Sequence, residues 1–153
     1  MLENLTVRDL IGERTNVFFV EANDTTDIAA LKIRNFRVRT IGVMSDGEIV
    51  GVVGNSDFST KVVAMSKSPS QVRVSDIMST LIHKVTLNST IFDCLDLMDK
   101  YTISHLFVMD DEGKYYGMLA WKDIQQRLVE ELKYQLHIAH EYAFGPIIKE
   151  NSS

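Results

Sequence analysis

The sequence predicts an α+β fold in which two small units, each a three-stranded sheet flanked by helices, pack face to face with pseudo-twofold symmetry. A C-terminal helical extension is expected to follow. The same order of apolar and turn segments occurs twice, about 65 residues apart. Within each copy, apolar residues at helical spacing alternate with short β-branched runs. One copy buries too little apolar surface to be stable alone, so the two sheets should form a shared core.

The first copy is expected at residues 5–65, in the order helix, strand, helix, strand, strand and helix. Thr6 is a suitable N-cap of the opening helix, with Asp9 three residues later. The first strand is expected in the β-branched and aromatic run 17–20. A hairpin should follow the second helix, because Ser-Asp-Gly-Glu at 45–48 is a strong turn signal between apolar runs.

The second copy is expected at residues 73–130, after an exposed, serine-rich linker at 66–72. Its opening helix should begin near Val74, and its first strand should cover 85–87. The turn of its hairpin is the longer segment Asp-Asp-Glu-Gly at 110–113. The two copies therefore share one order of elements and differ mainly in the length of this turn.

The second helix of each copy should turn an apolar face toward the core. In the first copy this face is expected to contain Ile28, Leu31 and Phe36, which lie at helical spacing. The corresponding residues of the second copy are Leu95, Met98 and Tyr101.

Each copy closes on the pattern Gly-apolar-apolar-x-x-x-Asp, at 51–57 and at 117–123. Gly51 and Gly117 interrupt strand patterns and are expected at close backbone approaches. With this order of segments and this closing motif, the chain resembles the tandem CBS domain, also called a Bateman module, over about residues 5–130. The resemblance implies a regulatory module rather than an enzyme, with a ligand cleft on each side of the pair.

The resemblance also implies a function for the last residue of each motif. In relatives that bind adenosine compounds, this aspartate accepts hydrogen bonds from both ribose hydroxyls, because a carboxylate is an acceptor only. The matching residues are Asp57 and Asp123. A simpler interpretation is also open for both, since an aspartate in the first turn of a helix can cap that helix.

The chain departs from the family motif three residues before each aspartate. Many family members carry a serine or threonine there, whose hydroxyl contacts ribose or phosphate, whereas this chain has Gly54 and Ala120. Loss of one neutral hydrogen bond weakens binding by about tenfold at most. A nucleotide site at these positions is therefore weakened but still expected.

Basic and polar residues are expected near the ligand phosphates. In the family they stand at the start of the second strand of each repeat, which corresponds to Arg39 and Thr40 and, in the second copy, to Ser104 and His105. The planar fork of arginine matches phosphate geometry, whereas histidine contributes charge only when it is protonated. For the neighbouring Lys32 and Arg34, a solvated helix face is the favoured interpretation, and for Arg39 and His105 both interpretations stay open.

Apolar side chains that line the clefts would contact the base of the ligand. Taken singly, each candidate fits a core position better than a ligand contact. The candidates are Val17, Phe18 and Ile41 in the first copy and Ile82, Val85 and Leu106 in the second.

An apolar stripe at helical spacing continues past the second copy and stops at Gly145-Pro146. We expect a helix in the extension 131–148 and a disordered tail at 149–153. A stripe of this length needs a partner surface. A second chain in a homodimer is the preferred partner. The alternatives are that the helix folds back on its own module or binds an unidentified protein.

Several classes of protein are excluded by composition. The net charge of −5 and the lack of an overall basic face argue against a nucleic-acid partner. No apolar run approaches the roughly 18 residues of a membrane span, and no secretory signal begins the chain, so a cytoplasmic location is expected. Cys94 resembles a small buried residue, and His137, His140 and Glu141 a solvated helix face. We expect no catalysis, no bound metal and no required cofactor.

Two functions remain open. The first is a sensor that binds AMP, ADP, ATP, NAD(H) or S-adenosylmethionine between the repeats, and that transmits the change through the C-terminal helix. The second is a dimerisation or adaptor module without a ligand, which the missing hydroxyls at Gly54 and Ala120 favour.

Overall fold

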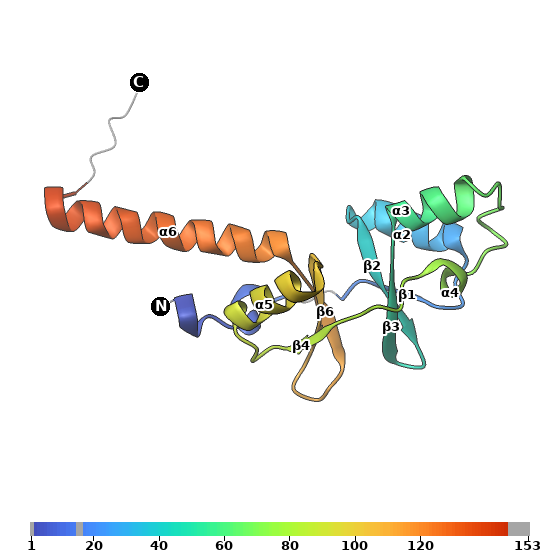
Figure 1. Ribbon diagram of the computed structural model, residues 1–153, viewed down its shortest axis with the longest axis horizontal. Coiled ribbons are helices and arrows are strands. Elements are labelled where there is room, and N and C mark those ends of the chain that lie inside the picture. Colours follow the sequence, from blue (N-terminus) through green and yellow to red (C-terminus); the bar gives the residue numbers. More distant parts are fainter. Residues whose placement is uncertain (1, 15–16, 147–153) are drawn as a thin grey trace, which may run out of the picture.

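The computed structural model describes residues 2–14 and 17–146. Within these residues the chain forms two units of the predicted kind, followed by one long helix that projects from them (Figure 1). The tail at 149–153, predicted to be disordered, and residues 147–148 of the extension lie outside the described residues.

The elements of the first unit follow the predicted order. A short 3₁₀ turn at Leu2–Asn4 precedes the unit, and a π-helical turn at Ser59–Val63 ends it. The elements are α1 (Val7–Ile11), β1 (Phe19–Glu21), α2 (Thr26–Phe36), β2 (Thr40–Ser45), β3 (Glu48–Gly54) and α3 (Asn55–Phe58).

The second unit repeats this order, and its last helix is the long one. The elements are α4 (Val74–Ile77), β4 (Lys84–Thr86), α5 (Ile91–Tyr101), β5 (His105–Met109), β6 (Tyr115–Ala120) and α6 (Trp121–Phe144). The turn between the second and third strands also lies where the sequence predicts it. Between β2 and β3, Asp46 and Gly47 have φ values of 52° and 79°, as a two-residue hairpin turn requires.

Each unit contains one sheet of three strands. β1 is parallel and β3 antiparallel to the central β2, and β4, β5 and β6 repeat this arrangement. The register irregularity also recurs, between Val43 and Met44 in β2 and between Val108 and Met109 in β5. This close correspondence makes the two units equivalent position by position.

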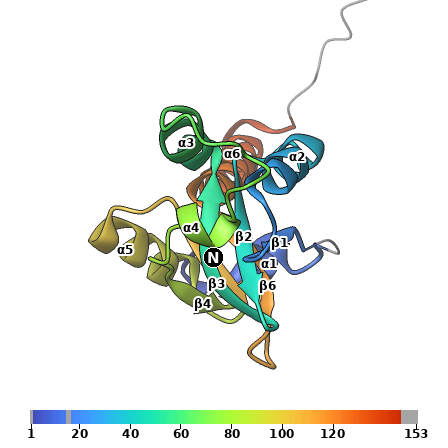
Figure 2. The same ribbon diagram turned by 90° about the vertical axis from the view of Figure 1, so that its right-hand side faces the viewer.

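The two sheets meet where β2 approaches β6. A Cβ at Gly42 would lie only 2.9 Å from the hydroxyl oxygen of Tyr115, so the Tyr115 side chain fills the space beside this glycine. Phe107 is buried and meets the Tyr115 ring edge-on, at 6.0 Å between ring centroids. Figure 2, a view along the long axis of the molecule, shows the helices arranged around the paired sheets.

The opening helices are exchanged between the units. Val7 and Ile11 of α1 lie in the hydrophobic core of the second unit, together with Leu106 and Leu119. The backbone N–H of Val7 also donates to the carbonyl of Ser89, at 2.9 Å. The helix that begins the first repeat in sequence therefore completes the core of the second.

The exchange is reciprocal. Val74 and Ile77 of α4 lie in the core of the first unit with Ile41 and Val53, and the Val74 N–H donates to the Asp24 carbonyl at 2.8 Å. The prediction of one shared core is therefore wrong, because the structure has two cores. A three-stranded sheet covered by one long helix leaves part of its apolar face open, and the opening helix of the other unit covers it.

The prediction of which face of α2 is buried is also wrong. Ile28 and Leu31 are 45% and 53% exposed, and Phe36 is exposed as well. The buried apolar positions are Ala29 and Ile33, which lie four residues apart on one face of the helix together with the buried Thr26. The small side chain of Ala29 lets α2 pack closely on the sheet, and this orientation turns Ile28 and Leu31 outward.

α6 packs on its own module only over its first turns. Ile124 is fully buried, whereas Leu132 and Leu136 further along are 52% and 69% exposed. In Figure 1 the far end of this helix extends beyond the two units. Among residues 2–14 and 17–146, no helix combines the length and the apolar character needed to cross a membrane.

Candidate functional site

The two aspartates of the closing motifs occupy equivalent places. Asp57 and Asp123 are each the third residue of a helix, α3 and α6. One carboxylate oxygen, Oδ2, accepts the backbone N–H of Gly54 or of Ala120, at 2.9 Å in both cases. Both aspartates therefore cap their helices, and each has its second oxygen, Oδ1, available for another donor.

In the first unit a lysine holds this second oxygen. Lys61 Nζ lies 2.9 Å from Asp57 Oδ1 and also donates to the carbonyl of Ile77, in α4, at 2.9 Å. The lysine thus connects the aspartate of one unit to the opening helix of the other. Its spacing of four residues from Asp57 is a recognisable helical ion-pair pattern, which the sequence analysis missed.

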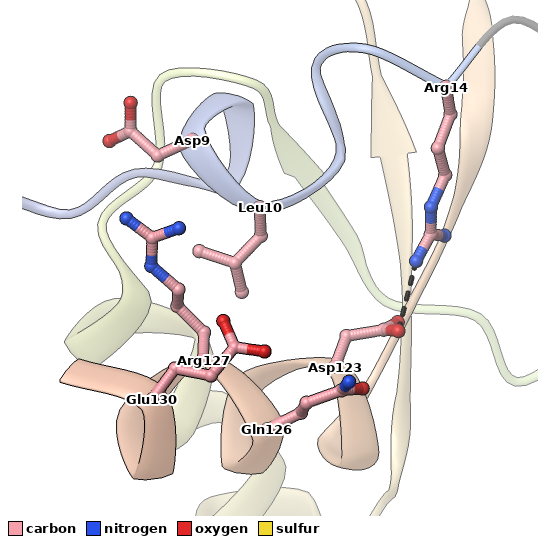
Figure 3. A pocket seen from close by; sticks show the side chains of 7 residues that line it. All are labelled: Asp9, Leu10, Arg14, Asp123, Gln126, Arg127 and Glu130. Carbon is pink, nitrogen blue, oxygen red and sulfur yellow. Dashed lines mark ion pairs between the residues drawn. The ribbon is translucent and has the colours of Figure 1, made fainter. Parts of the chain in front are cut away.

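In the second unit an arginine pairs with the equivalent carboxylate oxygen. Arg14, which follows α1, pairs with Asp123 Oδ1 at 2.9 Å (Figure 3). It also donates to the Met118 carbonyl at 2.9 Å. Both ion pairs are partly exposed to solvent, where such pairs contribute about 0–1 kcal/mol. A ligand hydroxyl could therefore replace either cation at small cost.

The predicted polar residues gather beside these aspartates. The Asn55 N–H donates to the Arg39 carbonyl at 3.1 Å, and the equivalent Trp121 N–H donates to the Ser104 carbonyl at 2.8 Å. These bonds join the start of the central strand to the start of the closing helix in each unit. We define the first site as Arg39, Thr40, Gly54 and Asp57, and the second site as Ser104, His105, Ala120 and Asp123.

His105 in the second site is half-buried and lies near Asp123. Burial lowers the pKa of His105 below its usual 6.5, and the Asp123 carboxylate opposes part of this effect. Ser104 Oγ lies 3.0 Å from the Nδ1 of this histidine. His105 is therefore a neutral hydrogen-bonding group at pH 7 and does not offer a positive charge to a phosphate.

Three of the apolar candidates belong to the cores. Ile41 and Leu106 are fully buried, and Val85 is almost so. They lie in the two hydrophobic clusters, so their side chains are closed to a ligand. Alternating strand periodicity cannot separate a core residue from a cleft residue, which explains why the sequence placed them among the candidates.

The remaining apolar candidates lie nearer the surface. Val17 and Phe18 are exposed, and Ile82 is half-buried. The Phe18 ring stacks on Phe36, with ring centroids 4.2 Å apart. The equivalent stack in the second unit joins His83 and Tyr101, at 4.1 Å. The sequence analysis missed both stacks, since the stacked residues are 18 positions apart in the chain.

Two hollows in the surface border the second unit. One, of about 260 Å³, lies between α1 and α6 beside Asp123 (Figure 3). The other, of about 360 Å³, lies where α5 ends and β5 begins. The first is lined by Asp9, Leu10, Arg14, Asp123, Gln126, Arg127 and Glu130, and the second by Met98, Asp99, Thr102, Ile103 and Ser104.

The other side chains considered for catalysis or metal binding lie in surroundings that favour a structural role. Cys94 is buried in the core of the second unit, and burial, with a smaller effect of Asp93, raises its pKa to about 11. The thiol is therefore protonated at neutral pH. His137 pairs with Glu141 at 3.2 Å on exposed α6. In the part of the chain that the structure describes, no three His, Cys, Asp or Glu residues are grouped as metal ligands.

Gly54 leaves no room for the hydroxyl-bearing side chain of the family motif. A Cβ at this position would lie 2.8 Å from Thr40 Cγ2 and 3.1 Å from the carbonyl oxygen of Arg39. Ala120 at the equivalent position already carries a Cβ. The two sites therefore differ near the backbone, because only the second already accommodates a Cβ at the position of the missing hydroxyl.

We expect Gly54→Ser to lower the free energy of unfolding by about 1–2 kcal/mol, because the new Cβ overpacks against Thr40. Ala120→Ser, the matched control, should change it by less than about 0.5 kcal/mol. Urea unfolding measures both values. Adding Thr40→Ser, which removes Cγ2, should restore most of the loss. Equal values for the two serine variants would contradict this account.

Two equivalent units with exchanged opening helices and matched aspartate sites define a paired-repeat module. The chain belongs to the CBS domain family, whose pattern matches residues 7–64 and 74–130. It is 30% identical to a CBS domain-containing protein of Arabidopsis thaliana, over 68% of this chain and 19% of that protein. It is 33% identical to an uncharacterized protein of Methanocaldococcus jannaschii, over 65% of this chain and 57% of that protein. The chain thus spans only part of these relatives.

Solved structures have the same fold. A crystal structure of a CBS domain is 30% identical, with a TM-score of 0.72, covering 81% of this chain and 97% of that one. A CBS domain pair in complex with 5′-methylthioadenosine and S-adenosyl-L-methionine is 20% identical, with a TM-score of 0.67 over 80% and 98% of the two chains. These similarities confirm the paired CBS fold.

Proposed function

We propose that the chain is a regulatory module that binds an adenosine-containing ligand, such as AMP, ADP, ATP, NAD(H) or S-adenosylmethionine. The observation that carries this proposal is the pair of equivalent aspartates, Asp57 and Asp123, each beside the start of a central strand. Each offers one oxygen held only by an exchangeable cation, which suits a ribose diol. The fold shared with a CBS pair that contains adenosyl ligands supports this choice.

Ligand binding would change how the units are held together. A ribose at Asp57 displaces Lys61, and a ribose at Asp123 displaces Arg14. Lys61 reaches α4, and Arg14 follows α1, so each displacement loosens a contact between units. A ligand that prefers the loosened arrangement shifts the population toward it, and α6, which continues from the second site, transmits the shift.

The test is calorimetry with these adenosine compounds on the wild type, Asp57→Asn and Asp123→Asn. We expect at least one compound to bind, and each variant to lose about tenfold or more at its own site, because a charged acceptor is lost. Asp110→Asn is the matched control, since Asp110 also accepts backbone N–H groups, those of Glu112 and Lys114 at 2.9 Å, and lies in a hairpin turn at the far end of β5 from His105. Wild-type affinity in both site variants would refute the ribose anchors.

The second candidate is a dimerisation or adaptor module without a ligand. Exposed apolar side chains favour it, namely Ile28 and Leu31 on α2 and Leu132 and Leu136 on α6. This function predicts a homodimer, or a complex with a protein partner, whose melting temperature no adenosine compound changes. The same calorimetry, with a measurement of molecular mass in solution, distinguishes the two. The homodimer and the cytoplasmic location stay predictions.

A further inference from the structure

The hollow of about 260 Å³ between α1 and α6 is lined by charges of both signs. Arg14 and Arg127 are its two cations, and its carboxylates are those of Asp9, Asp123 and Glu130. Over residues 2–14 and 17–146, the ion pair of Arg14 with Asp123 is the only one within this set. One cation and two carboxylates of the hollow therefore have no ion-pair partner in the described part of the chain.

The clearest of these unpaired groups is the Arg127 side chain. Its Nε atom is buried and lacks a hydrogen-bond partner among the residues that the structure describes. Such atoms are rare in folded proteins, because a buried donor without an acceptor is unfavourable. Figure 3 shows the guanidinium extending toward Asp9, on the α1 side of the hollow. A negatively charged acceptor in the hollow would give this guanidinium the partner that it lacks.

Comparison with the first unit explains why Arg127 is unpaired. Arg127 follows Asp123 at the spacing at which Lys61 follows Asp57. Lys61 uses this spacing to pair with Asp57 Oδ1 at 2.9 Å. In the second unit Arg14 holds the equivalent oxygen of Asp123, so Arg127 is left for another anion.

The unpaired acids also distinguish the second unit. At the position of Glu130 in α6 the first unit has Ala64, so its equivalent surface lacks this carboxylate. Glu130 is exposed. Asp9 accepts the Thr6 N–H through Oδ2, at 2.9 Å, so a donor from a ligand can take its Oδ1. The hollow thus offers two carboxylates to a positively charged donor.

These surroundings disfavour simple ions as ligands. An inorganic anion would meet three carboxylates, and a metal cation would meet two guanidinium groups. A small group that carries an ammonium and a carboxylate next to each other satisfies both signs at once. The zwitterionic α-amino-acid group has this arrangement of charges.

We infer that the hollow binds a zwitterionic α-amino-acid group, which forms the end of an adenosine ligand anchored at Asp123. Its carboxylate lies on Arg127, and its ammonium lies between Asp9 and Glu130. Asp123 lines the same hollow, so the 5′ substituent of a ribose bound there starts beside these residues. This inference rests on the proposed function, and it names the class of ligand that the second site takes.

The net charge of the lining adds a preference within this class. Two cations and three carboxylates leave one negative charge in excess. The sulfonium of S-adenosylmethionine supplies one positive charge beyond the zwitterion, whereas S-adenosylhomocysteine, a thioether, does not. S-adenosylmethionine is therefore the expected ligand of the second site.

The experiment is calorimetry with S-adenosylmethionine, S-adenosylhomocysteine and 5′-methylthioadenosine, a thioether that lacks the amino-acid group. Asp57→Asn is included throughout, because it removes the first ribose anchor. We expect both amino-acid compounds to bind about tenfold or more tightly than 5′-methylthioadenosine. Adding Arg127→Gln should reduce this advantage to about threefold or less and leave 5′-methylthioadenosine unaffected. Glu130→Gln should weaken the amino-acid compounds by about threefold, since Asp9 still accepts the ammonium.

Lys133→Gln is the matched control, because it removes one positive charge from an exposed position of the same helix that does not line the hollow. It should leave every affinity within about twofold, since exposed charges outside the site are screened. Asp123→Asn should weaken all three compounds, because all share the ribose. Equal losses in Arg127→Gln and Lys133→Gln would overturn the inference, and so would wild-type affinities in Arg127→Gln.

Failure of this inference and failure of the proposed function give different results. If S-adenosylhomocysteine and 5′-methylthioadenosine bind equally well, the amino-acid subsite is wrong and adenosine binding stands. If no adenosine compound binds, the proposed function fails, and free methionine then tests the hollow. Methionine binding that Arg127→Gln abolishes would keep the amino-acid subsite, with a free amino acid as its ligand. No methionine binding in that case would overturn the subsite as well.

Discussion

Ile11→Ala is expected to lower the free energy of unfolding by about 3 kcal/mol and to weaken the second unit, although Ile11 belongs to the first repeat in sequence. Ile11 is 1% exposed and packs in the core of the second unit with Leu106 and Leu119. Removing three carbons from such a position loses transfer free energy and leaves a cavity, which together cost about 2–5 kcal/mol.

Urea unfolding and amide hydrogen exchange measure this result. The amides of β4, β5 and β6 should lose protection first in Ile11→Ala, since their core has lost a packed side chain. Ile28→Ala is the matched control, because Ile28 is the same residue type on an exposed helix face of the first unit. It should cost less than about 1 kcal/mol. Lost protection confined to β1, β2 and β3 would contradict the helix exchange.

The order of elements could be predicted because it depends on local signals. The cap formed by Thr6 and Asp9, the turn at 45–48 and the alternation of helical and strand periods each lie within a few residues of one another. The exchange of α1 and α4 could not be predicted in this way. Periodicity says which face of a helix is apolar, but it does not say which sheet that face covers.

Sequence patterns were equally unable to show which face of α2 is buried and why each glycine interrupts a strand. Ile28 and Leu31 match a helical period as well as Ala29 and Ile33 do, and only packing against the sheet decides between the two faces. Gly117 was expected at a close backbone approach, but its surroundings are open and its φ of 153° explains the glycine. The prediction was right for Gly51, where another backbone lies close.

The candidate sites were predictable where the motif is local. The two aspartates and their helix-capping bonds follow from the closing motif of each copy. Arg14 could not be assigned to Asp123, because 109 residues separate the two and their contact depends on the helix exchange. The opposite error was to place core residues at the site. A strand next to a site also contributes side chains to the core, as is the case for Ile41, Val85 and Leu106.

Gly51→Ala is expected to cost about 3 kcal/mol, an unusually large effect for one methyl group. A Cβ at Gly51 would lie 2.7 Å from the carbonyl oxygen of Ser79 and 2.8 Å from Met78 Sδ. Val52 and Ser79 exchange two backbone hydrogen bonds there, at 2.9 and 2.8 Å. The added methyl forces this carbonyl away, so overpacking and the loss of these bonds both contribute.

Gly47→Ala is the matched control, because it adds the same methyl group to a turn in the same sheet. Nothing lies within 4 Å of a Cβ at Gly47, so only its positive φ of 79° is unfavourable, at a cost of about 1 kcal/mol. Urea unfolding of both variants gives the comparison. A cost for Gly51→Ala no greater than that of Gly47→Ala would mean that Ser79 moves away freely.

Gly51→Ala should also affect ligand binding differently at the two sites. Ser79 follows α4, and the carbonyl of Ile77 at the end of α4 holds Lys61 beside Asp57. Displacing this segment in Gly51→Ala therefore disturbs the first site, whereas Asp123 and Arg14 lie on other elements. Calorimetry should show weaker binding at the first site and wild-type binding at the second. An equal effect on both sites would mean that the exchanged helices couple the units more tightly than these contacts indicate.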